Sequence, residues 1–305
     1  MEKDSCDKNS GCNTCGTANQ CDEKLKQEHE DRLLRETLAV IRHKVFVLSG
    51  KGGVGKSTVA VNLAASLAAR GYETGILDID IHGPNVSKML GLEGWTLSSG
   101  GKKDKISPFR PFPHLKVISI AGLLPDSDSP VIWRGPLKMA AIRQFLQDVD
   151  WGPLDFLIVD SPPGTGDEPL SVAQLIPEAD GAVIVTTPQE VALLDSRKCV
   201  NFAKKLNLPV LGIVENMSGL RCPHCDGHIP LFSEGGGRTA AGELDVPFLG
   251  ALPIAPDMVD HCDNGQPYVL TDEKNELKDA FQEIVNRLVE AVEKNNKACS
   301  TGEAF

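Results

Sequence analysis

Short apolar runs recur along most of the chain and predict β-strands. They span residues 45–48, 72–79, 115–120, 154–159, 181–186, 210–214 and 248–252. Helix-prone stretches lie between them, among them residues 58–69, 137–148 and 190–205. Strands that alternate with helices are typical of a parallel sheet with helices on both faces, so the pattern predicts an α/β fold.

The C-terminal part of the chain has a helical rather than a strand-like pattern. Its apolar positions recur at three- and one-residue steps and are Leu277, Ala280, Phe281, Ile284, Val285, Leu288, Val289 and Val292. This spacing predicts an amphipathic helix. Its polar side carries more acidic than basic residues, which suits anionic lipid poorly. We therefore expect this helix to pack on the domain and not on a membrane.

Two further stretches lack strand patterning. Residues 24–43 are charged and helix-prone, which predicts a linker or a packing arm. Residues 91–114 are rich in Gly, Ser, Lys and Pro, which predicts a long surface loop.

Composition narrows the class of protein. The chain has 305 residues, 41% hydrophobic and 24% charged, enough for one large α/β domain. It contains no apolar run near 18 residues and no N-terminal leader, so we expect a cytoplasmic protein without a membrane partner. A formal net charge of -11 argues against a nucleic-acid partner, because such binding depends on Lys and Arg at phosphates.

The run GKGGVGKS at residues 50–57 follows the first apolar run directly and precedes a helix-prone stretch. This context indicates a P-loop, in which backbone N–H groups approach phosphate oxygens. Lys56 is expected to reach the β- and γ-phosphates of ATP, and Ser57 is expected to bind Mg²⁺. The predicted nucleotide-binding residues are Gly50, Lys51, Gly52, Gly53, Val54, Gly55, Lys56, Ser57 and Thr58.

Lys51 is unusual, because most P-loops have no second lysine after the first glycine. The run resembles the deviant Walker A loop of the MinD, ParA and nitrogenase iron-protein ATPases. The resemblance implies that Lys51 crosses a dimer interface and meets the charge that develops at the partner's nucleotide. The alternative is a solvated loop lysine.

Carboxylates follow two other predicted strands. Asp78 and Asp80 end the run at residues 72–79, and Asp160 ends the run at residues 154–159. Ligands bind at the carboxyl ends of strands in parallel α/β sheets. Asp160 suits Mg²⁺ coordination and Asp80 suits orientation of the attacking water. Aspartates that merely cap the next helix are the alternative.

Cysteines form two clusters in a chain without a secretory leader, which favours metal or redox sulfur over disulfides. Cys6, Cys12, Cys15 and Cys21 lie in a polar segment with few apolar residues. Four thiolates can fill one metal site, and metal binding would then supply folding energy. Zinc and a [4Fe-4S] cluster both fit this spacing, and a disordered leader is the alternative.

The second cluster is Cys222 and Cys225, a CxxC that provides half a metal site. A second copy of the chain can complete a four-cysteine site across a two-fold axis. Alternatively, His224 or His228 completes a zinc knuckle, or the pair is a redox dithiol. We favour the bridging cluster.

Four ordered motifs carry a more specific resemblance. They are GKGGVGKS at 50–57, DIDIHGPN at 78–85, DSPPGTGD at 160–167 and ENMSGLRCPHC at 215–225. Together they resemble the Mrp/NBP-type iron-sulfur carrier ATPases, called ApbC in bacteria, over residues 38–296. The N-terminal cysteines resemble the extension of some members, although Cys6 lies closer to Cys12 than is usual there.

The resemblance implies a function and a site. Family members assemble a labile [4Fe-4S] cluster at the CxxC of a homodimer and pass it to apo iron-sulfur proteins, governed by ATP binding and hydrolysis. By this resemblance Cys222 and Cys225 hold the transferable cluster, and the N-terminal cysteines hold a tighter one. Asn216 and the segment from Pro253 to Asp257 would surround the adenine.

The resulting division of the chain has three parts. Residues 1–37 form a cysteine-rich N-terminal extension and linker, residues 38–297 a P-loop ATPase domain, and residues 298–305 a C-terminal tail. Two other functions stay open at this point. One is a spatial organiser of the MinD or ParA type, and the other is an ATPase with purely structural zinc.

Overall fold

The computed structural model describes residues 23–80, 83–97, 105–123, 135–222, 224–225, 227–272 and 276–301. An eight-stranded sheet forms its centre, in the order β10-β7-β6-β1-β5-β2-β4-β3. The strands are β1 (Ile41–Ser49), β2 (Thr74–Asp78), β3 (Phe109–Phe112), β4 (Leu115–Ser119), β5 (Leu154–Asp160), β6 (Gly181–Thr186), β7 (Val210–Glu215) and β10 (Phe248–Ala251). All neighbouring pairs are parallel except β3 with β4, so the predicted parallel α/β sheet is confirmed.

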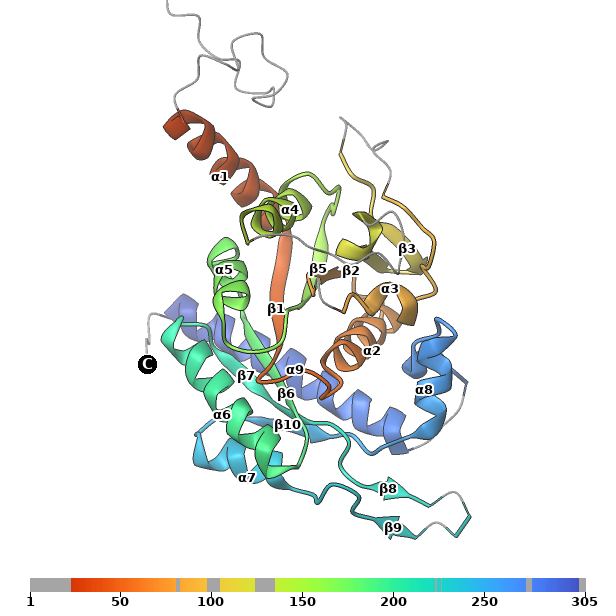
Figure 1. Ribbon diagram of the computed structural model, residues 1–305. Helices are drawn as coiled ribbons and strands as arrows, with labels where there is room; N and C mark the ends of the chain where they lie inside the picture. The colour runs from red at the N-terminus through yellow and green to blue at the C-terminus, as the bar shows by residue number, and fades with distance from the viewer. Residues whose placement is uncertain are drawn as a thin grey trace, which may run out of the picture.

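Helices cover both faces of this sheet (Figure 1). One face packs against α2 (Lys56–Ala69), α8 (Pro256–Asp263) and α9 (Glu276–Thr301), with α3 (Val86–Met89) beside α2. The other face packs against α1 (Glu23–Ala39), α4 (Gly135–Gln147), α5 (Asp167–Leu175), α6 (Glu190–Lys205) and α7 (Gly236–Glu243). Short 3-10 turns complete the described elements at Ile120–Leu123 and Tyr268–Leu270.

The central strand β1 shows why both faces need helices. Val45 and Val47 join one hydrophobic core, whereas Phe46 and Leu48 join the other. Successive side chains of a strand point to opposite faces, so an almost continuous apolar run requires cover on both sides. β1 and β5 lie in the middle of the sheet, and their carboxyl ends are therefore enclosed by neighbouring elements.

Several element boundaries differ from the prediction. Residues 24–43 were predicted as one helix-prone stretch, but α1 ends at Ala39 and β1 begins at Ile41. Leu34 and Leu38 of α1 are buried in the core, so α1 packs on the domain. The predicted loop at residues 91–114 is wrong in part, because β3 pairs there with β4 along the sheet edge. α9 is buried along its apolar face, as predicted, and continues to Thr301, within the segment predicted to be a tail.

A small two-stranded hairpin projects from the body. Its strands are β8 (Leu220–Arg221) and β9 (His228–Ile229), which pair antiparallel. Figure 1 shows the hairpin extending beyond the end of the sheet, below α8 and away from α1. The hairpin is the most protruding part among the described elements of that end.

Candidate functional site

The loop between β1 and α2 has the geometry of a phosphate cradle. Gly53 and Gly55 have positive φ angles of 78° and 82°, which glycine adopts without steric cost. Gly55 is the N-cap of α2, so the loop ends where the first backbone N–H groups of the helix have no intrahelical partner. These N–H groups, together with the helix dipole, favour an anion such as phosphate.

Close packing fixes the loop from two sides. A Cβ atom on Gly50 would lie 2.2 Å from the backbone carbon of Asp195 in α6. A Cβ atom on Gly55 would lie 2.2 Å from Nδ2 of Asn216, which donates a hydrogen bond to the Val54 carbonyl at 2.9 Å. The glycines therefore allow close approach of the loop to α6 and to the end of β7, in addition to the turn itself.

Lys56 lies at the centre of a buried charged cluster. Its Nζ donates to Oδ1 of Asp160 at 2.7 Å and lies 3.5 Å from Oδ2 of Asp80. Lys56 is 6% exposed, and Asp160 is fully buried. Parallel pairing between β2 and β5 sets Asp78 beside Asp160, which brings all three aspartates to one edge of the sheet. This register brings together carboxylates from two strands that the sequence analysis singled out separately.

Two carboxylate oxygens of the cluster have no hydrogen-bond partner. They are Oδ1 of Asp80 and Oδ2 of Asp160, and both atoms are buried. Buried carboxylate oxygens without a partner are costly, and Mg²⁺ prefers oxygen ligands. Ser57, which is buried at the start of α2, adds a hydroxyl next to Lys56. The donor set fits Mg²⁺, which Ser57 and Asp160 would hold directly or through water beside a bound nucleotide.

Burial also shifts the pKa values of two aspartates in this cluster. Burial and the nearby Asp160 raise the pKa of Asp78 to about 8, although a hydrogen bond from Ser119 opposes the shift. Burial also raises the pKa of Asp160, against the effect of the Lys56 ammonium. Asp78 accepts hydrogen bonds from Ser119 and from the Asp80 backbone. It therefore holds the start of the loop that carries Asp80, a role that differs from cation binding.

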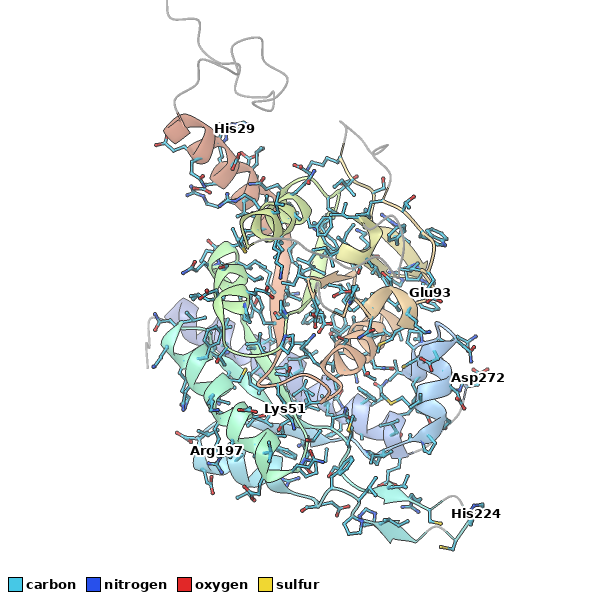
Figure 2. The ribbon with its side chains drawn as sticks, in the orientation of Figure 1. His29, Lys51, Glu93, Arg197, His224 and Asp272 are labelled. Carbon is cyan, nitrogen blue, oxygen red and sulfur yellow. The ribbon has the colours of Figure 1, made fainter. Side chains whose placement is uncertain are left out.

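Lys51 lies on the loop between β1 and α2, beside α6 (Figure 2). Its carbonyl accepts a hydrogen bond from Ser49 at 3.0 Å, which fixes the backbone there. The side chain is only partly buried, unlike that of Lys56. The two lysines of the motif thus occupy different environments, as the prediction of different roles requires.

Cys222 and Cys225 lie at the end of the hairpin. Cys222 follows β8, and its backbone N–H donates to the Gly227 carbonyl at 2.8 Å, while Cys225 is exposed. Figure 2 places His224, between the two cysteines, at the outer end of the hairpin. The CxxC is therefore displayed on the surface, away from the core.

One chain does not complete a metal site at this CxxC in the described residues, where no group of three or more Cys, His, Asp or Glu side chains is arranged to hold a metal. His228, one predicted zinc ligand, instead contacts Glu234 through Nε2. The CxxC is thus half a site within this range. Cys6, Cys12, Cys15 and Cys21 lie outside the described residues, so their ligand role stays a prediction.

The predicted adenine residues come from the end of β7 and from the segment that follows β10. Asn216 is buried beside the P-loop, and Asp257 accepts a hydrogen bond from the Tyr268 hydroxyl at 2.8 Å. Pro253 and Asp257 line a cavity of about 460 Å³ that also reaches Arg221 and Cys222. The segment that follows β10 therefore lies beside the cysteine hairpin.

The sequence interpretation missed two residues of this region. Glu215 is fully buried at the end of β7 and binds both ends of the segment that carries the hairpin. Asp195 provides the backbone against which Gly50 packs. The acidic residue that ends an apolar strand was a signal for Glu215, whereas nothing local to Asp195 indicated its contact.

The fold and the site define a P-loop NTPase: a parallel sheet, a glycine-rich loop that caps a helix, and a lysine paired with a strand-end aspartate. The model of the NUBPL iron-transfer P-loop NTPases matches residues 40–289, and the chain belongs to this family. The resemblance found from the sequence motifs is thereby confirmed.

Individual relatives agree with this assignment. An iron-sulfur cluster carrier protein of Methanocaldococcus jannaschii is 51% identical, over 92% of this chain and 96% of the relative. One from Pyrococcus horikoshii is 52% identical, over 81% of this chain and 86% of the relative.

Solved structures give the same fold. A nucleotide-binding protein from Archaeoglobus fulgidus in complex with ADP has a TM-score of 0.70 and 37% identity, over 81% of this chain and 98% of that chain. The cell division ATPase MinD of Pyrococcus furiosus has a TM-score of 0.61 and 25% identity, with the same coverage. Within the described residues, no helix has the length and apolarity needed to cross a membrane.

Proposed function

We propose that this protein assembles [4Fe-4S] clusters and transfers them to apo-proteins, under the control of ATP binding and hydrolysis. The cluster is the cargo, and Cys222 and Cys225 hold it. The observation that carries the proposal is a CxxC at the end of a hairpin on a P-loop NTPase domain, with Cys225 exposed and Cys222 half-buried. The names of relatives about 50% identical to this chain agree with it.

The protein acts as a homodimer in this proposal. A [4Fe-4S] cluster needs four ligands, and the CxxC provides two. Since the described part of one chain offers no third or fourth ligand there, a second copy supplies the other two cysteines. Ligands shared between two chains separate when the chains move apart, which suits a cargo that must be released. The exposure of Cys225 also leaves room for an acceptor protein to approach.

The nucleotide site has its own set of roles. Residues 50–58 hold the phosphates of ATP, with Lys56 directed to the β- and γ-phosphates. Ser57 and Asp160 hold Mg²⁺, which supplies charge neutralisation at the phosphates when bound. Asp80 orients the attacking water, and its unpartnered Oδ1 is available for that hydrogen bond. Lys51 acts on the nucleotide of the other subunit, and Asn216, Pro253 and Asp257 surround the adenine.

The N-terminal cysteines form the second part of the proposal. Cys6, Cys12, Cys15 and Cys21 hold a second, tighter [4Fe-4S] cluster. This cluster stays with the protein during transfer, because four ligands from one chain do not separate when a dimer rearranges. We place the protein in the cytoplasm, with apo iron-sulfur proteins as partners and no nucleic acid.

A transfer assay tests the function. The protein is reconstituted with iron and sulfide without oxygen, freed of unbound iron, and mixed with an apo-enzyme that needs a [4Fe-4S] cluster. We expect the wild type to activate the enzyme, with a rate that differs between MgATP and MgADP. The Cys222→Ser variant should bind nucleotide normally and fail to activate. Tightly held zinc at both cysteine sites and no activation would refute the carrier function.

A further inference from the structure

The segment that carries the CxxC leaves β7 and returns at α7, and one buried carboxylate joins both ends. Oε1 of Glu215 accepts hydrogen bonds from the Ser218 hydroxyl at 2.6 Å and from the Gly235 backbone N–H at 2.9 Å. Oε2 accepts from the Gly237 backbone N–H. Ser218 lies where the segment departs, and Gly235 and Gly237 lie where it returns.

Glu215 is an unusual residue for this position. It is fully buried, yet its donors are a hydroxyl and two backbone N–H groups, all of them neutral. A buried carboxylate is costly unless hydrogen bonds compensate for the lost contact with water. The start of α7 helps, because its positive dipole end favours an anion. Breaking any one of these bonds therefore weakens the compensation, so Glu215 and the two ends of the segment move together.

Glycines at the start of α7 make this contact possible. Gly235 has a φ of 75°, and a Cβ atom on Gly237 would lie 3.0 Å from Oε2 of Glu215. A Cβ atom on Gly236 would lie 2.6 Å from Cδ1 of Leu193 in α6. The same helix packs its Asp195 backbone against Gly50 of the P-loop. The returning end of the segment is thus in contact with the helix that contacts the P-loop.

A second connection runs through the next residue in the chain. Asn216 donates its Nδ2 hydrogen bond to the Val54 carbonyl of the P-loop, and its own backbone N–H bonds to Thr186. A displacement of the Val54 carbonyl therefore acts on the residue adjacent to Glu215. Because Glu215 holds both ends of the hairpin segment, it passes such a displacement to both ends at once.

The hairpin is also attached to the segment that directly follows β10, the strand next to β7. Ser218 donates its backbone N–H to the Leu252 carbonyl at 2.9 Å, and Ile254 donates to the Gly219 carbonyl at 2.8 Å. Leu220 and Ile254 form a parallel bridge beyond these bonds. The root of the hairpin thus continues the pairing of β7 with β10, which makes it a stiff extension of the sheet and not a loose loop.

We propose that Glu215 is a positioning residue that couples nucleotide occupancy of the P-loop to the position of the CxxC hairpin. This inference rests on the proposed function, and it adds the connection between the two sites. Glu215 contacts neither the phosphates nor the cluster in this scheme. It acts through Asn216 on one side and through Ser218, Gly235 and Gly237 on the other.

The test measures the hairpin without any cluster. Iodoacetamide labelling of Cys222 and Cys225 is followed by peptide mass spectrometry in the full-length, metal-free protein. Rates are compared with and without a non-hydrolysable MgATP analogue. We expect the analogue to change the wild-type rates about fivefold or more, the low end of common allosteric couplings. In Glu215→Gln the rates with and without the analogue should agree, while the affinity for the analogue stays near that of the wild type.

Two further variants make the result decisive. Glu234 lies in the same segment and packs against Gly219, but its carboxylate contacts His228 and, among the described residues, accepts no hydrogen bond from a backbone N–H of either end. The Glu234→Gln variant should therefore keep the wild-type response. Ser218→Ala removes one of the three hydrogen bonds, so the analogue should change its labelling rates less than those of the wild type. This variant provides the test if Glu215→Gln does not fold. A wild-type response in both Glu215→Gln and Ser218→Ala, or no response in the wild type, would overturn the inference. Failure of cluster reconstitution in the wild type would instead refute the proposed function and leave the labelling result intact.

Discussion

Nζ of Lys56 donates a hydrogen bond to Oδ1 of Asp160 at 2.7 Å, so the P-loop lysine and a strand-end aspartate form an ion pair in the buried interior of the protein. The pair joins the first turn of α2 to the carboxyl end of β5. Asp160 keeps a second, unpartnered oxygen, and Lys56 also lies near Asp80. In the proposed function, a nucleotide with Mg²⁺ divides this cluster, with the cation at the carboxylates and the lysine at the phosphates.

Lys56→Ala should have two separable effects. It removes a charge-assisted contact to phosphate, worth about 2 kcal/mol or more, so the affinity for MgATP should fall at least about 30-fold in equilibrium binding. It also leaves Asp160 buried without its cation, which lowers the free energy of unfolding by about 3 kcal/mol in denaturant titrations. Iron bound at the N-terminal cysteines should not change. Wild-type MgATP affinity in this variant would show that the loop does not bind phosphate as proposed.

Gly55→Ala should destabilise the nucleotide-free protein. The new Cβ atom would lie 2.2 Å from Nδ2 of Asn216, at a residue with a φ of 82°. We expect a loss of about 1–3 kcal/mol, from backbone strain and from the broken Asn216 hydrogen bond to Val54. Gly52→Ala is the matched control, because nothing lies within 4 Å of its added Cβ atom. Equal melting temperatures for the two variants would contradict the packing described here.

Lys51→Ala should separate nucleotide binding from hydrolysis. If Lys51 acts on the nucleotide of the other subunit, its loss removes charge stabilisation in the transition state and lowers the hydrolysis rate at least about 100-fold. The affinity of one chain for MgATP should change little, because Lys56 and the backbone N–H groups remain. Steady-state hydrolysis and equilibrium binding check this together. An equal loss in both would assign Lys51 to its own nucleotide.

The cysteines should differ strongly in reactivity. Burial raises the pKa of Cys199 to about 12, so its thiolate is scarce at pH 8 and its sulfur is also inaccessible. We expect iodoacetamide to label Cys225 at least about 100-fold faster than Cys199 in the folded, metal-free protein. Urea should raise the labelling rate of Cys199 to that of an ordinary thiol, because unfolding removes both the burial of its sulfur and the pKa shift that burial causes. Rapid labelling of Cys199 in the native state would contradict its burial.

Local patterns predicted most of the fold. The apolar runs at 115–120, 154–159 and 181–186 lie on β4, β5 and β6, because strands buried on both faces are nearly continuous in hydrophobicity. The start of β1 was missed, since Arg42 and His43 were included in the predicted helical arm at residues 24–43. His43 and Lys44 are nevertheless buried. The His43 ring is hydrogen-bonded to Asp180, and the Lys44 ammonium donates to the Ile41 carbonyl. Tertiary partners decide such positions, and a local pattern does not contain them.

The candidate site was likewise predictable only in part. The P-loop and the strand-end aspartates follow from local motifs, whereas the register of β2 with β5, which brings Asp78 and Asp160 together, is seen only in the structure. The contact of Asn216 with Val54 joins residues that are 162 positions apart, so no local signal announced it. The three hydrogen bonds of Glu215 depend likewise on where α7 returns to the sheet. Long-range contacts of this kind cannot be predicted from local sequence.

Metal analysis with Mössbauer spectroscopy tests the central claim most directly. The wild type and Cys222→Ala are reconstituted with iron and sulfide without oxygen, and unbound iron is removed. We predict the loss of about four irons per dimer in the variant, with a [4Fe-4S] signal from the N-terminal cysteines and unchanged MgATP binding. The same iron content and spectrum in both proteins, or tightly bound zinc in place of iron, would contradict a transferable cluster at Cys222 and Cys225.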